Sequence, residues 1–233
     1  MRDVIARVWF GVVAAIAIWG VTLSASIWVM TDPAALVAHG GGHGNPADFD
    51  NWFVRLTITF FYFTILSNVV VGVTSLLLAI RLDRTSTVFR VFRLFGLFSI
   101  IITGLVVNFY LGKFVHLEGI DLINNDMVHV VVPILATLGW LIFGPRTPFR
   151  FKYLFYAMGI GLVWLLVTFI HGALLHWYPY PFLDVDNIGY PKALTISFAI
   201  LAFAFLLGMA ILGLDKVLPG HDKLLEETEQ PTA

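Results

Sequence analysis

The sequence contains no cysteine, which excludes disulfides, thiolate catalysis and cysteine-ligated metals. It is also poor in charge, since 12% of its 233 residues are charged, whereas soluble domains carry about 25%. The formal net charge of −1 offers no basic surface for a nucleic acid, so we expect no nucleic-acid partner. So few charged side chains cannot coat a soluble globule of this size, and lipid is therefore the expected solvent.

Apolar residues dominate instead, at 59% of the chain with a mean hydropathy of +0.88. Each apolar stretch has about 17 residues or more, enough for a helix to cross about 30 Å of hydrocarbon. The sequence predicts an all-α fold, a bundle of six transmembrane helices within residues 1–214, followed by a polar cytoplasmic tail at 215–233. The predicted spans are 8–30, 52–80, 91–115, 127–143, 153–175 and 193–214.

The first span follows two arginines, as the core of a signal peptide would. Trp28 and Met30 extend its apolar run beyond a usual signal core, which favours a retained helix. Lys and Arg gather on the even-numbered connections and at the two ends, with Arg55, Lys113 and Lys192 as the exceptions. The positive-inside rule therefore predicts that both termini lie in the cytoplasm.

Polar side chains inside the second and third spans are candidates for function, because each is costly in lipid without a partner. On a continuous helix, Thr57, Thr64 and Asn68 share one stripe. Asn108 lies between Gly104 and Gly112, on a face that permits close helix approach. Hydrogen bonds that only hold helices together would also explain these residues.

The fourth span opens with a histidine and an acid on one face. Asp126 and His129 are three residues apart, so the carboxylate is placed to orient the imidazole. Pro133 lacks the N–H that would bond the carbonyl of His129. By residue counting from 127, however, His129 lies near the outer surface and well above Thr64, so helix tilt or a deeper helix start must close that gap.

The fifth span carries a second histidine, His171, on one stripe with Trp164 and Thr168. A buried histidine bonded between helices explains His171 as well as a catalytic one does. The aromatic residues that follow it, including Tyr180, are typical of a belt at the membrane interface.

Three segments together resemble a known family. They are residues 63–68 (Phe-Thr-Ile-Leu-Ser-Asn), His129 shortly before Pro133, and residues 180–183 (Tyr-Pro-Phe-Leu) after a histidine-bearing helix. They resemble the androgen-induced protein family of membrane hydrolases, which includes the androgen-dependent TFPI-regulating protein and bacterial relatives. The resemblance implies a hydrolase of fatty acid esters of hydroxy fatty acids in a bacterial cytoplasmic membrane. It also implies Thr64 as the nucleophile and His129 as the histidine that acts with it, with no cofactor or metal.

Two functions from different classes remain open at this point. In a lipid ester hydrolase, Asp126, His129 and Thr64 would be orienter, base and nucleophile, while Asn68, Asn108 or His171 would stabilise an oxyanion. In a binding protein, His129 and His171 would ligate a haem or hold another ligand. The expected partner is a lipid or fatty-acyl ester in the first case.

Overall fold

The computed structural model describes residues 1–34, 50–113, 117–144 and 149–218. Most of the polar tail expected at 215–233 lies outside these ranges. Across the described residues the regular elements are all helical, and six helical segments are long and apolar enough to cross a membrane. The expected all-α fold with six possible membrane spans is thus confirmed. The segments are Arg2–Met30, Phe63–Ile80, Thr87–Phe109, Gly119–Phe143, Phe151–Leu175 and Tyr190–Val217.

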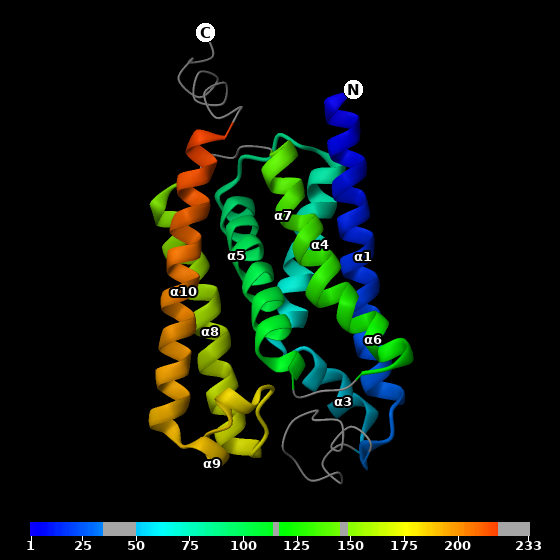
Figure 1. Ribbon diagram of the computed structural model, residues 1–233, viewed down its shortest axis with the longest axis vertical. Helices are drawn as coiled ribbons and strands as arrows, with labels where there is room; N and C mark the ends of the chain where they lie inside the picture. The colour runs from blue at the N-terminus through cyan, green and yellow to red at the C-terminus, as the bar shows by residue number, and fades with distance from the viewer. Residues whose placement is uncertain (35–49, 114–116, 145–148, 219–233) are drawn as a thin grey trace.

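The helices form two groups on either side of a central one (Figure 1). On one side lie α1, α4 and the α6–α7 segment, and on the other lie α8 and α10, with α5 between them. The start of α1 and the end of α10 lie at the same end of the bundle, which we call the terminal end. The labelled helices are α1 (Arg2–Met30), α3 (Trp52–Thr59), α4 (Phe63–Ile80), α5 (Thr87–Phe109), α6 (Gly119–Asp126), α7 (Val132–Phe143), α8 (Phe151–Leu175), α9 (Val185–Ile188) and α10 (Tyr190–Val217).

Small residues let the helices approach closely on both sides of α5. A Cβ at Gly72 of α4 would lie 3.4 Å from the Cβ of Ala17 in α1, so the two helices are in direct contact there. On the other side, a Cβ at Gly208 of α10 would overlap Leu154 of α8. Glycine at 208 is therefore what allows α8 and α10 to pack together near the terminal end.

The second predicted span is interrupted, which corrects the expectation of one continuous helix over 52–80. Helix α3 ends at Thr59, and α4 begins at Phe63 after a short turn. A run of β-branched and aromatic residues leads into this turn, and such residues are weak helix formers. The Phe61 carbonyl freed by the break accepts a hydrogen bond from Trp164 Nε1 at 2.9 Å. Thr57 therefore lies on a different helix from Thr64 and does not share its stripe.

The fourth span begins earlier than the sequence predicts and changes its winding midway. Helix α6 starts at Gly119, and a π-helical turn over Met127–Val131 joins it to α7. Pro133 stands in the first turn of α7, where its missing N–H leaves the preceding turn without an α-helical bond. The π turn and the proline together expose backbone carbonyls in the middle of a membrane span.

The connection after α8 folds back onto the bundle. His176 ends α8 in the left-handed conformation, with φ 51°. Tyr178 then packs directly on Gly172, where any side chain would overlap its ring. Trp177 and Tyr178 are both buried, so the connection is anchored on its own helix before it reaches Tyr180.

Candidate catalytic site

Thr64 lies in the first turn of α4, directly after the interruption. Its side chain is nearly buried, with 7% of the residue exposed. The Oγ1 atom lies 3.1 Å from Nε2 of His129, on the π-helical turn of the fourth span. The structure thus brings together a hydroxyl and an imidazole that are far apart in the sequence, within hydrogen-bond reach.

The second ring nitrogen of His129 fixes the direction of this hydrogen bond. Nδ1 lies 3.1 Å from the backbone carbonyl of Asn125, and a carbonyl can only accept. Nδ1 therefore carries the proton in the neutral ring, Nε2 accepts, and Thr64 donates. This is the tautomer that a general base needs toward a hydroxyl nucleophile.

The orienting group is thus the Asn125 carbonyl, which corrects the expectation that the Asp126 carboxylate holds the ring. Asp126 is exposed, and its Oδ1 accepts a hydrogen bond of 3.4 Å from Nδ2 of Asn125. A backbone carbonyl stays neutral at every pH, so the alignment of His129 does not depend on an ionised acid.

A third group, the hydroxyl of Tyr180, reaches Thr64 from the connection between α8 and α9. It accepts a hydrogen bond of 3.2 Å from the Thr64 N–H. This N–H has no acceptor within its own helix because it belongs to the first turn. The Tyr180 hydroxyl also lies 3.4 Å from Thr64 Oγ1. Since Oγ1 gives its proton to His129, Tyr180 is the donor in this contact. The chain of donation therefore runs from Tyr180 through Thr64 to His129.

The Tyr180 phenol keeps its proton through the neutral range. Burial raises its pKa above the usual value, although hydrogen bonds from the backbone of Thr64 and Phe63 lower it in part. The positive end of the α4 dipole lies at the same place. A neutral hydroxyl at the start of a helix is a suitable partner for a negative oxygen that forms beside Thr64.

Asn68 and Asn108 support the backbone around the site instead of pointing donors into it. Asn68 Nδ2 donates to the carbonyls of Thr64 at 2.8 Å and Val128 at 3.2 Å. Asn108 Nδ2 donates to the carbonyl of Gly104 at 2.8 Å and to that of His129 at 3.0 Å. Each amide group donates both of its N–H protons to backbone carbonyls, so neither side chain is an oxyanion donor in this arrangement.

Each of these bonds has a clear cause in the local backbone. The His129 carbonyl is available to Asn108 because Pro133 has no N–H to bond it. Asn68 links the helix that carries Thr64 to the turn that carries His129, and so it bridges the two halves of the site. Both asparagines are therefore positioning residues.

His171 lies outside this network. Its ring packs on Phe61 with centroids 4.1 Å apart and on Trp177 at 5.7 Å. Its buried Nδ1 has no hydrogen-bond partner among the described residues. Both nitrogens of His129 are already bonded, so a haem shared by the two histidines would require His129 to leave Thr64. The described residues also contain no group of three or more His, Asp or Glu that could hold a metal ion.

The early start of α6 closes the depth gap expected from the sequence. With a rise of about 1.5 Å per residue, His129 lies about 15 Å along the helix from Gly119. The imidazole therefore reaches the level of Thr64, which itself begins a shortened helix.

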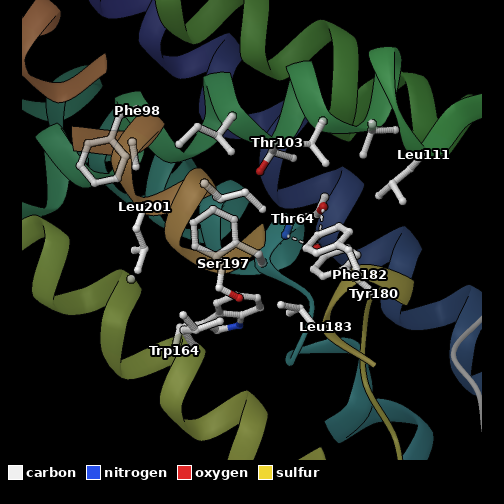
Figure 2. Close-up of a pocket in the computed structure, with 18 of the residues that line it drawn as sticks. Thr64, Phe98, Thr103, Leu111, Trp164, Tyr180, Phe182, Leu183, Ser197 and Leu201 are labelled. Carbon is white, nitrogen blue, oxygen red and sulfur yellow. Dashed lines mark hydrogen bonds between the residues drawn. The ribbon is translucent and has the colours of Figure 1, made fainter. Parts of the chain in front are cut away.

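A mostly apolar cavity adjoins Thr64 between α5, α8 and α10 (Figure 2). It holds about 770 Å³ of empty space, including the part that is open to the outside. Thr64 and Tyr180 contribute their polar atoms at one point of its wall. Most of the remaining wall comes from aliphatic and aromatic side chains, as expected for a ligand with much hydrocarbon.

Two parts of this site have no clear pattern in the sequence. The aromatic residues around Tyr180 are typical of an interfacial belt, and only the fold of its connection reveals the contact with Thr64. Asn125 contributes a backbone carbonyl, which every residue has, so no residue pattern marks it.

Searches against models of known protein families, against curated proteins and against solved structures each found no match.

Proposed function

We propose that the protein is an intramembrane hydrolase of lipid esters, with Thr64 as the nucleophile and His129 as the general base. The observation that carries this proposal is the 3.1 Å contact between Thr64 Oγ1 and His129 Nε2, with Nδ1 held on a carbonyl. A threonine hydroxyl becomes an effective nucleophile when a base within reach removes its proton. The resemblance noted in the sequence further suggests fatty acid esters of hydroxy fatty acids as substrates.

The reaction follows from these positions. Thr64 Oγ1 attacks the ester carbonyl carbon as its proton passes to His129 Nε2, and Tyr180 donates a hydrogen bond to the oxyanion. The ester C–O bond then breaks, and His129 returns the proton to the leaving alcohol. A water molecule attacks the acyl-threonine with His129 again as base. The acid leaves, and Thr64 recovers its proton.

The test is ester hydrolysis and fluorophosphonate labelling of the purified protein in detergent. Thr64→Ala should abolish both, and Thr64→Ser should retain part of the activity because it keeps a hydroxyl. Ser197→Ala is the matched control, since Ser197 lines the same cavity but donates to the Ala193 carbonyl at 2.8 Å. Full hydrolysis by Thr64→Ala would end the proposal.

The bias of basic residues supports a cytoplasmic membrane with both termini inside. Alkaline phosphatase fused after Val217 should then be inactive in a bacterial host, and the same reporter fused after Thr31 should be active. These positions end α10 and α1 at opposite ends of the bundle (Figure 1). Activity from the fusion after Val217 would contradict the orientation.

A further inference from the structure

The part of the cavity that leads from Thr64 toward the terminal end has an apolar wall. Figure 2 shows Phe98 and Leu201 on one side of Thr64, and Leu111 and Phe182 on the other. The first part is completed by Met158, Gly161 and Ala204. We call this part, lined by Phe98, Met158, Gly161, Leu201 and Ala204, the inner arm.

Two hydroxyls also line the cavity, but both are satisfied by the protein. Ser197 donates to the carbonyl of Ala193. Ser67 gives its proton to the Thr64 carbonyl at 2.9 Å, so Thr103, 3.1 Å from Ser67 Oγ, is the donor in that pair. Neither group calls for a polar partner on a ligand. Beyond Thr64 and Tyr180, the cavity therefore favours hydrocarbon.

The inner arm closes against the packed core. Phe95 and Leu154, both fully buried, belong to the cluster beyond it. Gly161 leaves open space in this wall, since a Cβ there would have Phe95 Cε2 as its nearest neighbour, at 4.0 Å. A larger side chain at 161 thus has room to fit, and it would occupy the space of the arm.

We infer that the inner arm holds a hydrocarbon chain of the ester and that Gly161 sets the length of chain it accepts. This inference rests on the proposed function, because it places the ester carbonyl at Thr64 at the start of the arm. It names a specificity-determining residue that makes no contact with the reacting atoms.

The test compares Gly161→Leu with Gly159→Leu. Gly159 is on the same helix, but a Cβ there has nothing within 4 Å, so the control adds the same side chain outside the cavity. One substrate series is the p-nitrophenyl esters of butyrate, octanoate and palmitate, and the other is acetates of alcohols of matched length. Gly161→Leu should lose about tenfold or more in kcat/KM for the longest substrates. It should keep wild-type rates on the shortest.

If kcat/KM falls for the long p-nitrophenyl esters, the arm holds the acyl chain. If it falls for the acetates of long alcohols, the arm holds the alcohol chain. Unchanged length preference in both series would overturn the inference while leaving the hydrolase intact. Photolabelling with a diazirine-bearing palmitate separates the two proposals, because it needs no turnover. Thr64→Ala should be labelled like wild type and Gly161→Leu should not. Equal labelling of Gly161→Leu and Gly159→Leu would also overturn the inference.

Discussion

The two ends of this bundle are built differently. At the terminal end, α5 packs through the fully buried Leu94, Phe95 and Leu97 against uninterrupted helices. At the opposite end the second span is broken before Thr64, and the fourth contains the π turn that carries His129. At the first end the free carbonyls are those of helix ends, and Arg7 donates to the carbonyls of Ala79 and Ile80 there. At the second end the interruptions free backbone groups inside the spans, beside the reactive side chains.

The difference teaches how a membrane protein can place catalytic groups within apolar helices. Every break frees an N–H or a carbonyl, and lipid cannot satisfy either. Here the freed groups are met by Tyr180, Trp164 and Asn108, which also fix the positions of the reacting side chains. The packed core at the terminal end holds together the helices whose other ends carry the interruptions.

The largest expected effect comes from removing the proposed base at the interrupted end of the bundle. His129→Ala should lower ester hydrolysis by about 10²–10⁴-fold, because Thr64 then has no base. The double variant with Thr64→Ala should lose little more, since the two residues act as a unit. Wild-type activity should also fall as the medium is acidified, because a protonated imidazole cannot accept the threonine proton.

The matched control for this prediction is His171→Ala, which removes a histidine that packs on Phe61 outside the network. It should retain most of the activity of the wild type. The opposite result, with turnover kept by His129→Ala and lost by His171→Ala, would move the base to α8.

The next largest effect comes from a substitution in the packed core at the terminal end, which leaves the proposed catalytic residues in place. Leu154→Ala should lower the free energy of unfolding by about 2–5 kcal/mol, because it leaves a cavity in the packed core. Hydrolysis per folded molecule should stay close to wild type. Thermal unfolding in detergent and active-site titration measure the two quantities. Leu174→Ala, on the same helix with 73% of the residue exposed, should change stability by about 0.5 kcal/mol or less.

The smallest effect tests the role of Tyr180 in the connection after α8. Tyr180→Phe should lower kcat by about 10²-fold with little change in KM, because it removes one donor to the oxyanion. The ring should stay in place, since it stacks on Phe182 at 5.1 Å with an interplanar angle of 4°. Tyr178→Phe is the control, because the buried Tyr178 hydroxyl has no hydrogen-bond partner in the described part of the chain.

The pH profile tests the same residue. Because burial raises the pKa of Tyr180, its proton should be retained beyond the usual value of about 10. Wild-type kcat should therefore hold at alkaline pH and fall only above that value, and this alkaline fall should be absent in Tyr180→Phe. A fall at the same pH in both proteins would assign it to another group.

The sequence predicts the six spans because length and hydropathy alone decide whether a helix can cross a membrane. It also selects Thr64, Asn68, Asn108 and His129, because polar side chains in apolar stretches stand out. The break before Thr64 is not predicted, since hydropathy runs through it unchanged. The roles of the asparagines are not predicted either, because they depend on which carbonyls the breaks release.

The π-helical turn makes the site depend on chain length as well as on side-chain identity. Such a turn holds one residue more than an α-helical turn. Deleting Val131, between His129 and Pro133, would restore ordinary winding and leave the helix on either side nearly in register. The carbonyls of Val128 and His129, which the turn leaves to Asn68 and Asn108, would then return to helical bonds. A one-residue deletion at this turn would thus remove the support of the site with every functional side chain still present.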